Sequence, residues 1–335
     1  MPGPSGIPLV DVYRGEFVES VHAVAACAVD VEGRTLIERG DVEVPVYLRS
    51  TAKPFIAAAI VATGAAERFG FDARELAVMA ASHNGEPFHV EAVRGILRKI
   101  GLDERALQCG AHAPSYEPAA AALAATGASP SAVHNNCSGK HAGILAGAVH
   151  LGADPATYRD PENPVQRHIA AFCGRAFADD PARWPTGIDG CGAPIFASSL
   201  RRTAGAFARL ATLEGLDGDD ARALGAVRAA MLAEPAYVGG TARFDTALMR
   251  ITYGGIACKG GAEGLHGDAL VRARAGFALK VVDGNSRATP PATLAFLRAL
   301  RALEPGEVDG LAGFAEPEVR NVAGRVVGKI SARAL

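Results

Sequence analysis

The order of apolar and polar positions along the chain predicts strands at both ends and helices between them. Residues 8–48 are rich in β-branched side chains, and the run 21–31 followed by Gly33 is typical of a β-hairpin. Two further β-prone runs lie at 270–282 and 319–330. Strands from both chain ends favour one antiparallel sheet with an inserted helical lobe, and we therefore predict an α+β fold.

Helical patterns fill the region between these strands. We predict helices at 51–65, 73–82, 87–100 and 289–303. Ser50 and Asp72 are the predicted N-caps of the first two, because their side chains can accept hydrogen bonds from free backbone N–H groups.

The middle of the chain, residues 117–235, is rich in alanine and is predicted to be mostly helical. Loops with Gly, Asn and Pro interrupt it at 134–139 and 186–194. We expect a single domain of two lobes, an α/β lobe of residues 1–115 with 240–335 and a mainly helical lobe of residues 116–239.

Composition narrows the possible classes of protein. The 335 residues are 49% hydrophobic and 21% charged, with a net charge of −2, which argues against nucleic acid or an anionic membrane surface as a partner. No apolar run reaches the roughly 20 residues that cross a bilayer. Residues 1–9 lack the features of an export signal, so we expect a cytoplasmic protein whose six cysteines stay reduced.

Ser50 and Lys53 form the most informative local pattern. They are three residues apart at the predicted start of an apolar helix, so their side chains share one face. Only six of the 34 basic residues are lysines, and lysine, unlike arginine, can lose its proton when it is desolvated. The pair therefore predicts a serine nucleophile with an amine as its base.

Three further segments, 134–141, 187–194 and 258–264, combine glycine with polar or thiol side chains. Each could be an ordinary helix cap or turn. Cys137 and Cys191 could instead supply two thiolates to a metal, although no C-x-x-C or H-x-x-x-H pair completes a common zinc set. Lys140, if neutral, or His141 could be a third ligand.

Taken together, the segments resemble one enzyme family, the Rhizobium etli-type (class 3) L-asparaginases. The segments that carry the resemblance are Arg-Ser-Thr-Ala-Lys-Pro at 49–54, Ala-Ser-His at 81–83, His-Asn-Asn-Cys-Ser-Gly-Lys-His at 134–141, Asp-Gly-Cys-Gly-Ala-Pro at 189–194 and Lys-Gly-Gly-Ala-Glu-Gly at 259–264. They follow the family's order over nearly the whole chain.

The resemblance implies a fold similar to the serine β-lactamases and glutaminases, with a mixed sheet beside a helical lobe, and a homodimer. It implies two catalytic pairs, Ser50 with Lys53 and Ser82 with Lys259. It also implies a Zn²⁺ ion that aids substrate binding more than the chemistry itself. The zinc ligands carried over from the family are Cys137, Lys140 and Cys191, with water completing the shell.

The predicted reaction is hydrolysis of L-asparagine to L-aspartate and ammonia through an acyl-enzyme on Ser50, with Ser82 and Lys259 relaying protons. The predicted substrate-binding residues are Arg49, Asn136, His141 and Asp189. Asp189 would meet the α-ammonium group, and Arg49 or the amides of the 134–139 loop would lie near the carboxylate.

Three alternatives remain. A glutaminase or another Ser-Lys amidohydrolase would use the same residues. A β-lactamase or transpeptidase would share Ser-x-x-Lys, but the chain has no Lys-Thr-Gly triplet. The third alternative is not an enzyme but a zinc-binding or redox module built on Cys137 and Cys191.

Overall fold

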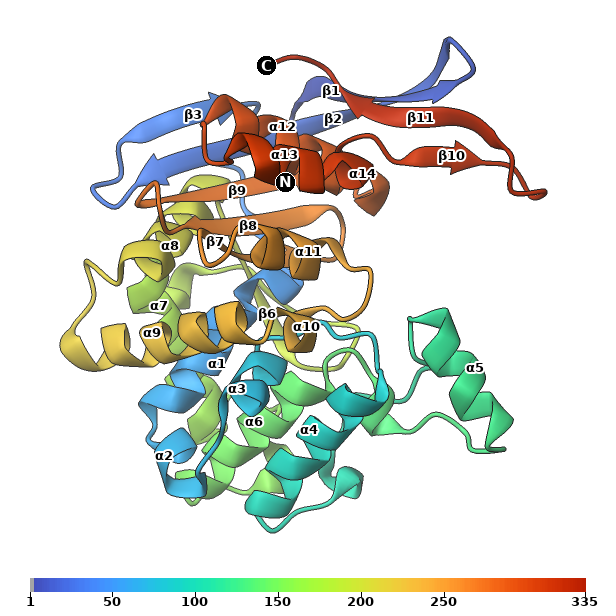
Figure 1. Cartoon of the computed structure of the whole chain (residues 1–335). Coiled ribbons are helices and arrows are strands. Elements are labelled where there is room, and N and C mark those ends of the chain that lie inside the picture. Colours follow the sequence, from blue (N-terminus) through green and yellow to red (C-terminus); the bar gives the residue numbers. More distant parts are fainter. Residues whose placement is uncertain (1–2) are drawn as a thin grey trace. The chain divides into compact units, whose positions relative to one another are not determined.

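The computed structural model describes residues 3–335, which form two compact units (Figure 1). The sheet unit comprises the chain up to Thr51 together with Ala197–Thr212 and Ala247–Leu335. The helical unit comprises Ala52–Phe196 and Leu213–Thr246. The predicted lobes divide the chain at other residues. They placed residues 53–99 with the strands, whereas α1 (Lys53–Ala62), α3 (Ala73–Met79) and α4 (Pro87–Lys99) all pack on α6 (Ser138–His150) and belong to the helical unit.

An antiparallel sheet dominates the sheet unit. Its strands are β1 (Ile7–Arg14), β2 (Phe17–Asp30), β3 (Thr35–Arg39), β7 (Ile256–Gly261), β8 (Leu265–Leu270), β9 (Ala275–Val281), β10 (Glu318–Arg320) and β11 (Val326–Ala332). The order is β10-β11-β1-β2-β9-β8-β7, and β3 pairs with the second half of β2. The predicted sheet from both chain ends is confirmed. The mixed sheet that the resemblance implied is wrong, since every strand pair within residues 3–335 is antiparallel.

Helices cover both faces of this sheet. Gly276 of β9 faces α8 (Leu200–Thr212), where a Cβ atom would lie 2.0 Å from the carbonyl oxygen of Ala204. Phe277, the next residue, points to the opposite face, and its ring contacts Phe296 of α12 (Thr289–Ala299) at 5.4 Å between centroids. The short helices α13 (Pro305–Gly310) and α14 (Ala312–Ala315) follow α12.

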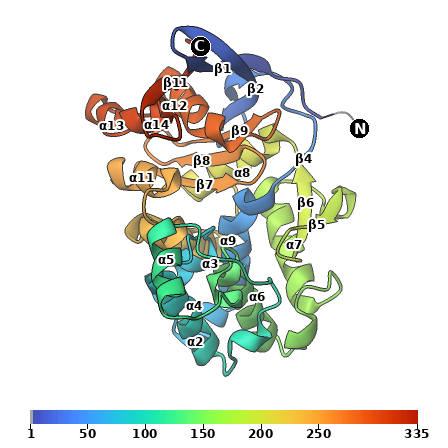
Figure 2. The same ribbon diagram turned by 90° about the vertical axis from the view of Figure 1, so that its right-hand side faces the viewer.

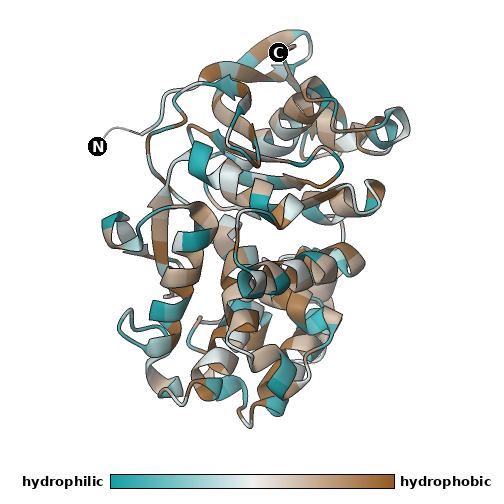
Figure 3. Ribbon diagram, turned by 90° about the vertical axis from the view of Figure 1, so that its left-hand side faces the viewer, coloured by the Kyte–Doolittle hydropathy of each residue, from teal (hydrophilic) through white to brown (hydrophobic). Residues whose placement is uncertain are grey.

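The helical unit is built around α6. Its helices are α1 (Lys53–Ala62), α2 (Ala65–Phe69), α3 (Ala73–Met79), α4 (Pro87–Lys99), α5 (Glu117–Ala125), α6 (Ser138–His150), α7 (Pro164–Phe177), α9 (Gly218–Ala233) and α10 (Pro235–Val238), while α11 (Phe244–Ile251) leads from this unit into the sheet unit. Helices α1, α3, α4 and α7 all pack on α6, which is buried from Ser138 to Ala148. Figure 3 shows hydrophobic and hydrophilic residues interspersed along the ribbon of the chain. Burial differs between the helices, since α6 is buried over most of its length whereas α5 has no buried residue.

Short strands replace the predicted loop at 186–194. β5 (Thr186–Ile188) pairs with the first residues of β6 (Pro194–Ser198), and β4 (Val46–Tyr47) pairs with the last two residues of β6. Figure 2 shows β5 and β6 beside α7. The loop between β5 and β6 carries Asp189 and Cys191, so the prediction of an irregular segment was correct only for the tip of this hairpin.

The predicted N-cap is correct for one helix and wrong for another. Asp72 caps α3 with a reciprocal capping box to Glu75, as predicted. Ser50 is not the cap of α1. It lies in a 3-10 turn, Arg49–Ala52, and Ala52 precedes the helix without a side-chain cap. No helix among residues 3–335 combines the length and apolar character needed to cross a membrane.

Candidate active site

Ser82 lies in an extended segment that follows α3 in the helical unit. Its backbone N–H donates to the carbonyl of Val238 at 3.0 Å, and the N–H of Asn84 donates to Gly239 at 3.0 Å. Between them, the N–H of His83 donates to the carbonyl of Asn136 at 3.2 Å. The segment is thus tied on both sides, which fixes the position of the Ser82 hydroxyl.

Lys53, the first residue of α1, is buried and its amine points to this segment. Nζ donates to Ser82 Oγ at 2.9 Å and to the carbonyl of Ala81 at 2.5 Å, and it lies 3.2 Å from Cys137 Sγ. Burial lowers the pKa of the Lys53 amine, although the neighbouring Cys137 raises it. The structure therefore pairs Lys53 with Ser82, a contact that sequence spacing did not predict.

Ser50 and Lys259 belong to the sheet unit, where their backbone segments are neighbours. A Cβ atom on Gly261 would lie 2.5 Å from Thr51 Oγ1 and 3.3 Å from the carbonyl oxygen of Leu48, so the end of β7 lies against the turn that carries Ser50. Lys259 is two residues earlier on the same strand and therefore on the same face. Its buried amine donates to the carbonyl of Gly260 at 2.6 Å.

Ser50 itself is half-buried, and the residue before it has an unusual backbone. Arg49 has φ of 47°, in the left-handed region that costs a non-glycine residue about 1–3 kcal/mol. The predicted pairs Ser50–Lys53 and Ser82–Lys259 each combine a residue of one unit with a residue of the other, and they stay predictions.

The predicted zinc ligands lie together within the helical unit. Cys137 and Lys140 are one turn apart at the start of α6, and Lys140 Nζ lies 3.1 Å from Cys191 Sγ. Asp189 joins them. The ligand atoms of Cys137, Asp189 and Cys191 all lie within 4.8 Å of one another, which places Asp189 beside the thiols.

The two thiols have opposite pKa shifts. A hydrogen bond from Cys191, together with the nearby amines of Lys53 and Lys140, holds the pKa of Cys137 well below its usual range despite burial. The same hydrogen bond, with burial, raises the pKa of Cys191. Burial alone would lower the pKa of Lys140, but the charges of both sulfurs raise it on balance. Two sulfurs, an amine and a carboxylate are donors that suit Zn²⁺, so these residues fit the predicted metal.

His141 is buried beside this cluster and is held by a residue that sequence reasoning missed. The hydroxyl of Tyr158 accepts the backbone N–H of Gln108 at 2.8 Å, so its own proton goes to Nδ1 of His141 at 2.7 Å. Burial lowers the pKa of His141 well below its usual range, which leaves a neutral ring protonated at Nε2. Within residues 3–335 this N–H has no partner. Tyr158 had no recognisable signal, since it is a fully buried tyrosine outside every motif.

His83 is a second residue of this region to which sequence reasoning gave no role. Its Nδ1 accepts the N–H of Gly85 at 3.1 Å, and its Nε2–H donates to Ser138 Oγ at 2.9 Å. Ser138 donates in turn to the carbonyl of Val133 at 2.8 Å. His83 thereby ties the Ser82 segment to the start of α6. Its place directly after Ser82 in the Ala-Ser-His motif was the available signal.

The predicted substrate-binding residues are divided between the units. Asn136, His141 and Asp189 lie in the helical unit with Lys53 and Ser82, whereas Arg49 lies in the sheet unit. Asn136 contributes backbone groups, since its N–H donates to His112 Nε2 at 2.9 Å and its carbonyl accepts from His83.

Comparisons with solved structures found chains of low sequence identity. A crystal structure of Mglu is 14% identical, with a TM-score of 0.38, over 83% of this chain and 67% of that one. Structures of Mglu in its native form in 4.3 M NaCl and in its tris and glutamate form are both 15% identical, also with TM-scores of 0.38. They cover 83% and 90% of this chain and 61% and 63% of their own, so this chain is shorter than those it matches.

Comparison with protein families gave a match over almost the entire chain. No curated protein sequence matches. The family described as L-asparaginase II matches residues 10–332, which include all of the predicted site residues. This match confirms the resemblance stated from the motifs and identifies an amidohydrolase of the asparaginase type. The chain belongs to the L-asparaginase II family.

Proposed function

We propose that this protein hydrolyses L-asparagine to L-aspartate and ammonia through a serine-bound acyl-enzyme. The observation that carries the proposal is the buried amine of Lys53, which donates to Ser82 Oγ at 2.9 Å. A desolvated amine beside a hydroxyl is an arrangement that can move a proton to and from an attacking serine.

Ser50 is the proposed nucleophile. It is more exposed than Ser82, which is 7% exposed, and it follows the strained backbone of Arg49. Lys53, three residues further on, takes the proton of Ser50 as the oxygen attacks the amide carbon. The C–N bond then breaks, and the same proton leaves with ammonia. Water hydrolyses the resulting ester and releases aspartate.

Ser82 and Lys259 are the proposed proton relay. Ser82 already accepts a hydrogen bond from Lys53, so it can pass a proton between that amine and the leaving nitrogen. Lys259 is buried, and it lies on the strand that contacts the Ser50 turn. A second cation near Lys53 would favour the neutral amine of Lys53.

Asp189, Asn136, His141 and Arg49 are the proposed substrate-binding groups. Asp189 would accept a hydrogen bond from the α-ammonium group, and Arg49 would bind the carboxylate. His141, fixed by Tyr158 as a neutral Nε2–H donor, is suited to an oxygen of the substrate.

Cys137, Lys140 and Cys191 would hold Zn²⁺. When bound, the ion supplies a fixed positive charge that can orient an anionic or polar group of the substrate. Lys140 has to be neutral to act as a ligand, so binding of the ion would release protons.

The proposal extends to the fold and the assembly. We infer an arrangement similar to the serine β-lactamases and glutaminases, with two lobes in one domain, and a homodimer that works in the cytoplasm. The antiparallel sheet with α8 and α12 on its faces supports the fold.

Ammonia release from asparagine and glutamine, measured side by side, tests the substrate. Faster release from asparagine is the expected result, and faster release from glutamine would identify a glutaminase. No release from either amide would leave the zinc-binding or redox module. In such a module, Cys191→Ala would abolish zinc binding, and no hydrolysis would remain to be measured. In an asparaginase, the same change would remove zinc and leave hydrolysis detectable.

A further inference from the structure

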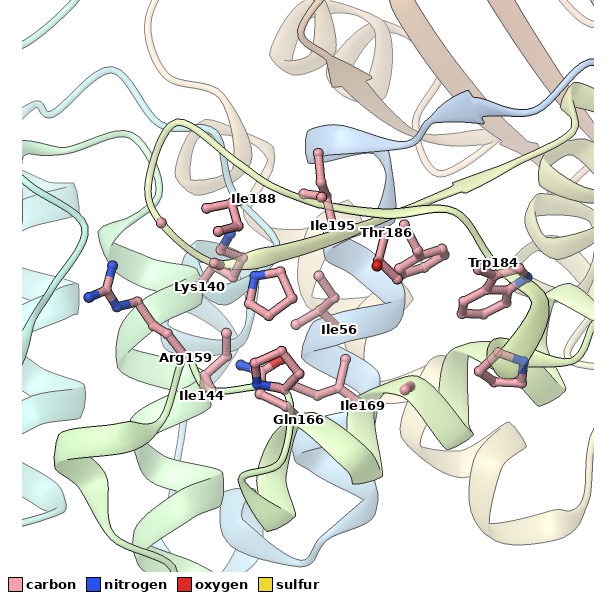
Figure 4. Close-up of a pocket in the computed structure, with 18 residues that line it drawn as sticks. Ile56, Lys140, Ile144, Arg159, Gln166, Ile169, Trp184, Thr186, Ile188 and Ile195 are labelled. Atoms are coloured by element: carbon pink, nitrogen blue, oxygen red, sulfur yellow. The ribbon is translucent and has the colours of Figure 1, made fainter. Parts of the chain in front are cut away.

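The helical unit contains a pocket of about 330 Å³ that none of the proposed catalytic serines lines. Its walls come from α1, α6, α7 and the β5–β6 hairpin (Figure 4). The volume lies at the lower end of the roughly 300–1,000 Å³ range of small-molecule sites. It is therefore large enough for a compact ligand.

Most of the pocket wall is apolar. Ile56, Ile144 and Ile169 each come from a different helix and line its middle. At one end the rings of Trp184 and Phe196 stack at 4.2 Å between centroids. The Nε1–H of Trp184 donates to Asp179 at 2.8 Å, so the indole offers the pocket only its apolar body. Such a wall does not suit a small zwitterion such as asparagine, whose charges would lose their hydration.

Arg159 provides one positive charge at the other end of the pocket, opposite Trp184 (Figure 4). Its Nε donates to Gln108 Oε1 at 2.8 Å, and within residues 3–335 no carboxylate lies within ion-pair distance of its guanidinium group. The guanidinium group lies against Gly192, where a Cβ atom would be only 2.1 Å from Nη1 of Arg159. Lys140 also lines this end, but its amine is hydrogen-bonded to Cys191.

We propose that this pocket binds a carboxylate with an apolar body, such as a medium-chain fatty acid. The carboxylate would pair with the Nη atoms of Arg159, and the apolar body would extend past Ile56 and Ile169 towards Trp184. An uncompensated guanidinium at one end of an apolar cavity complements this class of molecule in both charge and shape. Lys140, a proposed zinc ligand, lines one end of the pocket, but Ser50, Lys53, Ser82 and Lys259 do not line it, and the proposal does not depend on the proposed function.

The sequence provides a direct probe of this site. Trp184 is the only tryptophan in the chain and lies in the pocket wall, so its fluorescence reports on occupancy. Titration with decanoate, below its micelle concentration, should change this fluorescence in a saturable way. Decylamine, which has the same chain and the opposite charge, should bind at least about tenfold more weakly, since a charge-assisted pair contributes roughly 1.5–3 kcal/mol.

Two variants separate the head group from the tail. Arg159→Met should weaken decanoate binding about tenfold or more and leave decanol binding unchanged. Ala170→Phe, which fills the pocket from α7 and keeps Arg159, should abolish binding of both. The matched control is Arg167→Met, the same change at an arginine on α7 that does not line the pocket, and it should bind decanoate as the original protein does. Thermal unfolding checks that each variant is folded.

Several results would overturn the proposal. The first is the absence of a fluorescence change with both decanoate and 3-phenylpropanoate. The second is equal binding of decanoate and decylamine, and the third is an unchanged affinity of folded Arg159→Met for decanoate. A second copy of the chain in the pocket would also overturn it, and would appear as an oligomer that Ala170→Phe dissociates. Binding of 3-phenylpropanoate in preference to decanoate would support the carboxylate site and identify an aromatic body.

Discussion

The amine of Lys53 lies 2.9 Å from the hydroxyl of Ser82, although 29 residues separate them in the sequence. Lys53 begins α1, and Ser82 lies in the extended segment that follows α3. The contact gives Lys53 a serine partner other than Ser50, the partner that the Ser-x-x-Lys motif predicts. One buried amine could therefore serve both serines of the proposed mechanism, and the following predictions separate their roles.

Replacement of the two serines should have unequal effects. Ser50→Ala removes the proposed nucleophile and should lower kcat/KM by roughly 10⁴-fold or more. Ser82→Ala removes a proton relay and should lower kcat by about 10²–10⁴-fold while an acyl adduct still forms on Ser50. Mass spectrometry after reaction with a reactive asparagine analogue locates the adduct. An adduct on Ser82 would exchange the two roles.

Lys53 should tolerate neither arginine nor methionine. Arg cannot act as a neutral base, so Lys53→Arg should be as inactive as Lys53→Met, even though it retains the positive charge. The matched control is Lys329→Met at an exposed lysine, which should retain full kcat/KM. Substantial activity of Lys53→Arg in a steady-state ammonia assay would show that a charged side chain suffices at this position.

Zinc binding should depend on two of the six cysteines. Cys137→Ser and Cys191→Ser should each reduce the bound zinc per chain from about one ion towards zero, because both sulfurs belong to one ligand group. Cys109→Ser and Cys173→Ser replace buried thiols outside that group and should leave the content unchanged. Elemental analysis after dialysis against a zinc buffer measures the content. Full zinc content in Cys191→Ser would disprove this ligand set.

Acid should destabilise the helical unit through His89. Burial lowers the pKa of His89 from its usual value of 6.5 to about 4, and its ring accepts from Glu86 N–H and donates to the Ala236 carbonyl. Below pH 6.5 the unfolded chain binds a proton that the folded protein excludes until about pH 4, so stability is highest above pH 6.5 and falls between these values. The loss from this residue should be about 2 kcal/mol by pH 5.

The test for His89 is the pH dependence of unfolding by urea. His89→Gln keeps a donor for the Ala236 carbonyl but cannot be protonated, so the difference in unfolding free energy between the two proteins should shrink as the pH falls from 7 to 5. Parallel profiles would mean that His89 titrates alike in both states.

Close packing at the start of α6 should make Gly139 sensitive to a single methyl group. A Cβ atom there would lie 2.1 Å from the carbonyl oxygen of Val78, so Gly139→Ala should lower the unfolding free energy by about 1–3 kcal/mol. Cys137 directly precedes α6 and Lys140 lies in its first turn, so zinc affinity should fall together with the unfolding free energy. Gly306→Ala, where no atom lies within 4 Å of the added carbon, is the control. Equal melting temperatures would contradict this packing.

The sequence by itself determined features that depend on neighbours along the chain. The strands at both ends followed from runs of β-prone residues, and the cap at Asp72 followed from a side chain that reaches its own helix. Cys137 and Lys140 share a face because they are one helical turn apart. The family was recognisable from the same kind of signal, short motifs in a fixed order.

Only the tertiary structure brought together groups that are far apart in the sequence. The contact of Lys53 with Ser82, the place of Asp189 and Cys191 beside Cys137, and the support of His141 by Tyr158 all depend on how helices and the β5–β6 hairpin pack around α6. Helical and strand periodicity relates residues within one element, whereas packing between elements is set by the shapes of the buried surfaces. The pocket beside Arg159 arises from the same packing, which is why no sequence motif predicted it.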